Sequence, residues 1–303
     1  MTEVFPELFP FSPDVELALV KYGLDIADVR RVITTALTED LRYGGDATTA
    51  ATVPAGTRAL AELTPRVPGV VAGIPVALAV FDAVLGTDYE VLGARDDGER
   101  LVAGEPALVL SGPVRGLLTA ERTALNLLCH LSGIATATAA WVSEVDGTGC
   151  AIRDSRKTLP GLRLLQKYAV RCGGGVNYRL GLGDAVLIKD NHVVAAGSVT
   201  AALEAVREHA PELPCEVEVD DLAQLEEALL FGADEILLDN FSPEQCARAV
   251  ERRDEVSPKT RLDSSGGLTL DRAGAYARSG VDYLSVGALT HSAAVLDLGM
   301  DLH

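Results

Sequence analysis

The sequence predicts two differently built parts within 303 residues, a small α+β domain followed by an incomplete α/β barrel. Before about residue 127, helical segments precede short strand-like runs that Gly and Pro interrupt. After it, apolar strand-like runs alternate with amphipathic helical segments, which is typical of βα units around a parallel sheet. Six or seven such units fall short of the eight in a complete barrel.

The first part, residues 1–127, should combine helices with a sheet of short, mostly antiparallel strands. We expect helices over about 13–22 and 25–39. The strand-like runs lie at 59–65, 69–73, 88–93 and 106–112. A helix over about 119–144 would link the two parts, because apolar residues recur there at helical spacing: Leu125, Leu128, Leu131 and Ile134.

The second part, residues 128–291, is the predicted barrel, and residues 292–303 could pack back on the first domain. Its strand-like runs lie at 150–155, 185–191, 215–220, 235–240, 261–267 and 282–288. Helical segments between them lie at 203–210, 222–230, 243–253 and 270–280. A doubly wound Rossmann sheet is the alternative, but no G-x-G-x-x-G follows a first strand.

Composition indicates a cytoplasmic protein with a substantial apolar core. The net charge of -18 argues against a nucleic-acid partner. The sequence contains no run of about 18 apolar residues, so we expect no membrane span. The acidic, Pro-interrupted start does not resemble a signal peptide. Five scattered cysteines without a C-x-x-C pair suggest reduced thiols, with no disulfide framework or zinc site.

One segment has the opposite charge to the rest of the chain. Residues 150–189 carry only two acids, Asp154 and Asp184. They carry eight basic residues: Arg153, Arg156, Lys157, Arg163, Lys167, Arg171, Arg179 and Lys189. A solvated basic face is the plain interpretation. These cations alternate with Gly and Pro turns and lie at the ends of apolar runs, which favours a pocket for a small, densely anionic ligand.

Polar residues follow nearly every predicted strand, where a barrel builds its active site. In the strand at 215–220, the period of two places Glu216 and Glu218 on one face. Glu218 and Asp239, on neighbouring strands, could hold Mg²⁺ directly, through water or through a bound diphosphate. The alternative is a pair of carboxylates in salt bridges with Lys189 and Arg156.

Two glycine-containing turns near the end of the predicted barrel suggest a phosphate site. They are LDSSGGL at 262–268 and SVGALTH at 285–291. Glycine lets a backbone approach a ligand closely, and the next helix would begin with free N–H groups. Phosphate sites in barrels often follow the last two strands. Each turn alone is weak evidence for a phosphate site, but the two together favour a phosphorylated ligand.

The segment 154–192, DSRKTLPGLRLLQKYAVRCGGGVNYRLGLGDAVLIKDNH, resembles the signature of the quinolinate phosphoribosyltransferase family. Further motifs follow in the family's order: ERTALNLLCHLSGIAT at 121–136, CEVEVD at 215–220, ILLDN at 236–240, LDSSGG at 262–267 and VGALTHS at 286–292. The match runs from about residue 35 to the end of the sequence.

This resemblance implies an N-terminal α/β sandwich, an incomplete α/β barrel and a homodimer. It implies a pentosyltransferase that moves phosphoribose from phosphoribosyl pyrophosphate to the ring nitrogen of quinolinate. Loss of the 2-carboxylate as CO₂ then gives nicotinate mononucleotide and pyrophosphate, a step of pyridine-nucleotide (NAD) biosynthesis that needs Mg²⁺. We expect an oxocarbenium-like state at the ribose, with the enzyme supplying positioning and electrostatic stabilisation.

The resemblance also implies roles for individual residues. The dicarboxylate and the pyrophosphate would meet four cations: Arg156, Lys157, Arg179 and Lys189. Glu218 and Asp239 would face the ribose and the metal, and Lys157 joins them as an expected catalytic residue. The backbone of three residues would receive the 5′-phosphate: Ser265, Gly266 and Gly287. Arg122, in the ERTALN motif, would reach into the neighbouring subunit's site.

Two positions depart from the family pattern. Tyr178 stands where the family has histidine, and it can donate a hydrogen bond but cannot carry positive charge near neutral pH. Asp263 stands where glutamate is usual. A related phosphoribosyltransferase acting on another aromatic carboxylate is therefore the alternative, and a non-catalytic ligand-binding barrel is a more distant one.

Overall fold

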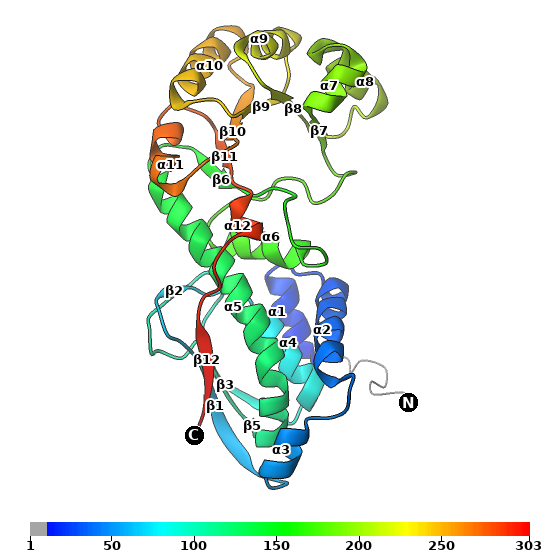
Figure 1. Ribbon diagram of the computed structural model, residues 1–303, viewed down its shortest axis with the longest axis vertical. Coiled ribbons are helices and arrows are strands. Elements are labelled where there is room, and N and C mark those ends of the chain that lie inside the picture. Colours follow the sequence, from blue (N-terminus) through cyan, green and yellow to red (C-terminus); the bar gives the residue numbers. More distant parts are fainter. Residues whose placement is uncertain (1–10) are drawn as a thin grey trace. The chain divides into compact units, whose positions relative to one another are not determined.

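The computed structural model describes residues 11–303, which divide into two compact units (Figure 1). The first unit extends to Ala137 and includes Leu159–Gly173 and Ser292–His303. The second comprises Thr138–Thr158 and Gly174–His291. The boundary expected after residue 127 falls inside one long helix, α5 (Val114–Glu144).

The first unit is built on an antiparallel sheet with the strand order β12-β1-β5-β3. Its strands are β1 (Arg58–Pro65), β3 (Glu90–Ala94), β5 (Leu108–Pro113) and β12 (Leu298–Leu302). A separate antiparallel pair joins β2 (Gly69–Val70) to β4 (Arg100–Leu101). The last strand of the chain thus completes a sheet begun by the first, with Leu63 opposite Met300.

Three helices of the first unit begin at side-chain caps that the sequence supplies. The unit contains the helices α1 (Pro13–Lys21), α2 (Ile26–Leu41), α3 (Ala47–Thr52), α4 (Ile74–Leu85) and α6 (Arg163–Cys172). Ser12, Asp25 and Asp46 each accept a hydrogen bond from a first-turn N–H group of the helix that follows. The expected helices at 13–22 and 25–39 are confirmed as α1 and α2.

Two helices differ from expectation. Helix α4 was not expected, because its apolar residues surround it and leave no amphipathic period to recognise. Helix α5 begins five residues before the expected start, at Val114. By length and composition α5 could cross a membrane, but 56% of its most apolar window is buried inside the structure, and one such helix is weak support for a span. Gly133 of α5 has no room for a side chain, since a Cβ would lie 2.2 Å from the carbonyl oxygen of Ala294.

The second unit is a six-stranded parallel sheet with the order β6-β11-β10-β9-β8-β7. Its strands are β6 (Ala151–Arg153), β7 (Val186–Ile188), β8 (Cys215–Val219), β9 (Glu235–Asp239), β10 (Arg261–Ser265) and β11 (Tyr283–Ser285). Its helices are α7 (Asp190–Ala196), α8 (Val199–His209), α9 (Leu222–Phe231), α10 (Pro243–Val256), α11 (Leu270–Ala277) and α12 (Ala288–His291).

All six expected strands of the barrel are present, and the incomplete α/β barrel is confirmed. Strands β6 and β7 end the order at opposite edges, and a single parallel bridge from Arg153 to Val176 extends the β6 edge. Figure 1 shows α8, α9 and α10 on the outer side of the curved sheet. In β8, Val217 and Val219 are fully buried, while Glu216 and Glu218 face the opposite side, as the period of two predicts.

Candidate active site

A cavity of about 440 Å³ lies at the carboxyl ends of the parallel strands in the second unit. It is lined by Asp154, Ser155, Arg156, Lys157, Tyr178, Arg179, Leu187, Lys189, Glu216, Glu218, Leu237, Asp239, Ser265 and Ser285. Asp239, Ser265 and Ser285 are the last residues of β9, β10 and β11. The cavity therefore occupies the edge where a barrel gathers catalytic residues.

Four of the predicted cations line this cavity: Arg156, Lys157, Arg179 and Lys189. Arg156 and Lys157 follow β6, and Lys189 follows β7 directly. The loop after β6 is fixed by hydrogen bonds: the Lys157 backbone N–H donates to Ser155 Oγ (3.1 Å) and its carbonyl accepts from Thr290 Oγ1 (2.9 Å). These cations can attract a ligand carrying phosphate and carboxylate groups.

Two predicted carboxylates, Glu218 and Asp239, line the same cavity from neighbouring strands. The Lys189 ammonium donates to Glu218 Oε2, so the predicted salt bridge exists at one of them. Burial raises the pKa of Asp239, and the nearby Asp220 raises it further, whereas Lys189 and Lys157 lower it. The net effect is a raised pKa for Asp239, and the two lysines limit the shift.

The predicted glycine turns follow β10 and β11. Ser265 lines the cavity, and Gly266 after it has a φ of +92°, a conformation that L side chains rarely adopt. At Gly287, an added Cβ would lie 2.8 Å from Cδ of Lys157. Helix α12 after the second turn has only four residues, so the contribution expected from its N-terminus is small.

A buried ionic cluster beneath the cavity was not predicted. Arg153 Nη1 donates to Glu216 Oε1 (3.5 Å), to Asp263 Oδ2 (3.1 Å) and to Glu235 Oε1. Burial and the neighbouring carboxylates raise the pKa of Glu216 well above its ordinary value, and burial raises that of Asp263. No sequence pattern connects these residues, because they come from four strands that only the fold brings together.

Tyr178 lines the cavity and also contacts this cluster. Its backbone N–H donates to Asp154 Oδ1 (2.9 Å), and its hydroxyl donates to the carbonyl oxygen of Val186 (3.3 Å). The Arg153 guanidinium lies 5.0 Å from the centre of its ring. Burial raises the pKa of Tyr178, and the nearby Glu216 raises it further, so the phenol stays neutral at physiological pH.

Arg122 is the predicted site residue that lies in the other compact unit. It belongs to α5, its side chain is 65% exposed, and it pairs loosely with Glu121 at 3.9 Å. It lines a separate cavity of about 370 Å³ together with Asp40, Asp46 and residues of α5. Within one protomer, the described structure therefore does not place Arg122 in the barrel cavity.

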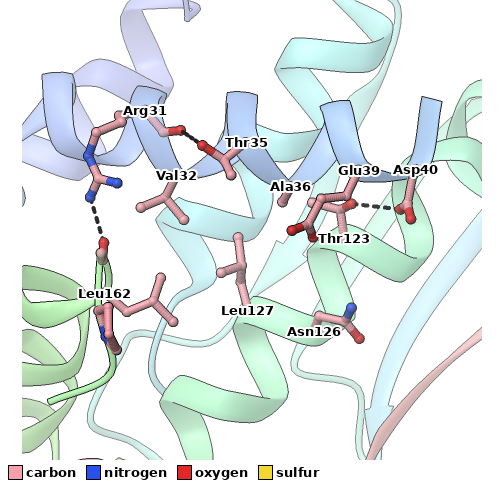
Figure 2. A pocket seen from close by; sticks show the side chains of 12 residues that line it. Arg31, Val32, Thr35, Ala36, Glu39, Asp40, Thr123, Asn126, Leu127 and Leu162 are labelled. Carbon is pink, nitrogen blue, oxygen red and sulfur yellow. Dashed lines mark hydrogen bonds between the residues drawn. The ribbon is translucent and has the colours of Figure 1, made fainter. Parts of the chain in front are cut away.

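Figure 2 shows another cavity of the first unit, about 350 Å³ in volume, between α2, α5 and the loop before α6. It contains a single basic residue, Arg31, which donates to the Gly161 carbonyl (2.5 Å) and to Asp28. Glu39 and Asp40 also line it, and Asp40 accepts from Thr123 (3.1 Å). Its acidic lining does not suit an anionic ligand.

The barrel cavity suits a magnesium ion only if the ligand contributes oxygens. Glu218 and Asp239 supply two carboxylates, and Mg²⁺ commonly combines one or two carboxylates with water and phosphate. Among the described residues, the only close group of three candidate metal ligands is Glu216, Glu235 and Asp263. Arg153 already supplies the positive charge there, so that group does not need a metal ion.

Known proteins are similar to this chain over most of its length. Residues 46–132 match the family model for the N-terminal domain of quinolinate phosphoribosyl transferase, and residues 134–301 match that for its C-terminal domain. The chain is 62% identical over 274 residues to a carboxylating nicotinate-nucleotide pyrophosphorylase of Mycobacterium leprae, covering 90% of this chain and 96% of that protein. It is 39% identical to the human protein of the same name, covering 80% and 82%.

Solved structures are similar over nearly the whole chain. NadC from Streptococcus pyogenes superposes with a TM-score of 0.86 at 39% identity, covering 93% of this chain and 99% of that one. The nicotinate-nucleotide pyrophosphorylase of Francisella tularensis gives 0.87 at 35% identity, covering 93% and 98%. With both domain models matched in order, the chain belongs to the quinolinate phosphoribosyl transferase family.

Proposed function

We propose that the barrel cavity transfers phosphoribose from phosphoribosyl pyrophosphate to quinolinate, giving nicotinate mononucleotide, pyrophosphate and CO₂. One observation carries the proposal: the four predicted cations, the predicted carboxylates Glu218 and Asp239, and Ser265 of a glycine turn all line one cavity in a chain of this family. A donor with three phosphate groups and an acceptor with two carboxylates need such a concentration of positive charge. The reaction belongs to NAD biosynthesis, and we place the enzyme in the cytoplasm.

The cationic residues would divide between the two substrates. Arg156, Arg179 and Lys189 would hold the carboxylates of the acceptor and the pyrophosphate of the donor. Lys157 would neutralise charge on the departing pyrophosphate. Because Arg binds carboxylate and phosphate with two parallel hydrogen bonds, the arginines also fix the orientation of the acceptor ring.

The carboxylates and the glycine turn would hold the ribose and its phosphate. Glu218 and Asp239 would face the ribose ring and stabilise positive charge as the bond to pyrophosphate breaks. The backbone around Ser265, Gly266 and Gly287 would receive the 5′-phosphate. Asp239 would hold Mg²⁺, with Glu218 reaching it through water or diphosphate. When bound, the ion would supply charge neutralisation for pyrophosphate.

The chemistry needs no covalent intermediate with the protein. Holding the acceptor nitrogen near C1 of the ribose makes the displacement effectively unimolecular. Once the ring nitrogen carries the ribose, its positive charge stabilises the electron pair that remains on C2 when the bond to the 2-carboxylate breaks and CO₂ departs. A proton from solvent then adds to C2 and gives nicotinate mononucleotide, while the protein holds the ring in place.

We propose a homodimer in which Arg122 completes the site of the neighbouring subunit. The exposed Arg122 side chain belongs to the first unit, and its guanidinium pairs only loosely with Glu121. An exposed cation can bind an anion held by another protomer without first breaking a strong bond.

The direct test is formation of nicotinate mononucleotide from quinolinate, phosphoribosyl pyrophosphate and Mg²⁺, with nicotinate and other pyridine and benzene carboxylates run in parallel. Turnover confined to quinolinate, with one CO₂ released per product, supports the proposal. Pyrophosphate release with another acid, and none with quinolinate, would refute the acceptor.

A second acceptor class deserves a place in that assay because of Tyr178. A neutral phenol stands where the family has a histidine, and its hydroxyl is bonded to the Val186 carbonyl. A site without that titratable cation could accept an aromatic acid with a different arrangement of carboxylates.

A further inference from the structure

Asn240, the residue after Asp239 at the carboxyl end of β9, has an unusual backbone conformation. Within residues 11–303, Asn240 is the only residue other than glycine with a positive φ, 56°. The left-handed region disfavours most side chains because Cβ approaches the neighbouring carbonyl oxygen, and asparagine tolerates it better than most. The turn after β9 therefore restricts which residue can follow Asp239.

Asn240 contacts two parts of the candidate site at once. Its side-chain Nδ2 donates to Asp239 Oδ2 at 2.6 Å. Its backbone N–H donates to the carbonyl oxygen of Ser265 at 2.9 Å, which extends the pairing of Asp239 with Ser265 at the ends of β9 and β10. The amide thus holds one oxygen of the carboxylate, and the backbone holds the turn that follows β10.

The side chain of Asn240 also lies directly against Gly266. A Cβ on Gly266 would lie 2.3 Å from Asn240 Oδ1 and 2.9 Å from Asn240 N. Gly266 has a φ of +92°, so both its conformation and its neighbour require glycine. The turns that follow β9 and β10 therefore pack against each other, and Asn240 makes the contacts between them.

We propose that Asn240 is a positioning residue that fixes the Asp239 carboxylate and seats the Ser265–Gly266 turn against it. The amide donor removes the freedom of the carboxylate to rotate away from the cavity. The backbone contact keeps the phosphate-facing turn at a set distance from that carboxylate. This inference rests on the proposed roles of Asp239, Ser265 and Gly266 in the transfer reaction.

The competing interpretation is that asparagine is present only because it tolerates the left-handed turn. The variant Asn240→Gly separates the two, since glycine adopts that conformation freely, keeps the backbone hydrogen bond and lacks the amide. We expect Asn240→Gly to lower kcat at least about tenfold, as removal of a hydrogen bond to a charged group does, and to leave the KM for phosphoribosyl pyrophosphate within about threefold. Asn240→Ala should affect both constants, because the backbone is then strained as well.

A double-mutant cycle shows whether Asn240 acts through Asp239. We expect Asp239→Asn to lower kcat strongly and the double variant Asp239→Asn with Asn240→Gly to lose little more, because the amide has lost its carboxylate. Calorimetric binding of phosphoribosyl pyrophosphate without acceptor, together with the melting temperature, should stay near wild type in Asn240→Gly.

The outcomes distinguish a failure of the positioning role of Asn240 from a failure of the proposed role of Asp239. A wild-type kcat in Asn240→Gly, or losses that simply add in the double variant, would overturn the positioning role while Asp239→Asn remains impaired. A wild-type kcat in Asp239→Asn would overturn the proposed role of Asp239 and the inference with it.

Discussion

The sequence suggested roles for some residues of the site. For others, the orientation of the side chain depends on the fold and could not be predicted. The family resemblance grouped Arg156, Lys157, Arg179 and Lys189 as ligand-binding cations, and all four line one cavity. It could not show the direction of the Tyr178 hydroxyl, because that depends on the Val186 carbonyl eight residues away.

Tyr178→Phe should change the KM for quinolinate by less than about threefold, because the hydroxyl bonds to protein groups, the Val186 carbonyl and the Glu216 side chain, and the ring is retained. A hydroxyl that bound an acceptor carboxylate would instead cost roughly tenfold or more on removal. Steady-state kinetics distinguishes the two. Tyr283→Phe is the matched control, since its ring also contacts Arg153 and its hydroxyl bonds to Arg261 outside the cavity.

Glu216→Gln should become more stabilising, relative to wild type, as pH rises from 5 to 8. The raised pKa of Glu216 means that the folded protein favours the protonated acid. That contribution to stability is complete below the unfolded pKa, about 4.3, and is lost as pH rises through the folded pKa. Glutamine stays neutral throughout. Melting temperatures of both proteins across this pH range test the direction of the change. If the advantage of Glu216→Gln over wild type shrank as pH rose, the prediction would be wrong.

At the scale of strands and helices, the alternation of apolar strand-like runs with amphipathic helical segments carried most of the prediction. The six barrel strands were recognisable because apolar runs end in polar residues. Helix α4 escaped recognition because it is apolar on all sides, and β12 because its partner β1 lies more than 200 residues earlier. The Arg153 cluster escaped for the same reason, since it joins β6, β8, β9 and β10.

Arg153→Met should destabilise the second unit by about 3–5 kcal/mol, because it leaves three buried carboxylates without their cation. Arg252→Met provides the comparison: Arg252 pairs with Glu226 and Glu255, but its side chain is 42% exposed, so its replacement should cost much less stability. Urea unfolding of both variants measures the difference. Equal losses would show that the cluster adds no more than surface pairs.

At the scale of the whole molecule, the proposed dimer predicts complementation between inactive variants. Arg122→Ala and Lys157→Ala should each be nearly inactive. If Arg122 serves the partner's site, a mixed dimer contains one intact site, and random mixing should restore about a quarter of the wild-type activity. Activity of the refolded mixture, against each variant refolded alone, gives the result. No recovery would place Arg122 outside the partner's site.

The pairing of β12 with β1 also bears on how the molecule is made. Strand β1 leaves the ribosome early, yet its partner on one side emerges only after the entire barrel sequence. Until then, one edge of β1 has unpaired backbone groups, which are open to pairing with other chains. During synthesis, the sheet of the first unit thus cannot be completed until β12 has been made. The barrel can fold before the domain that precedes it is complete.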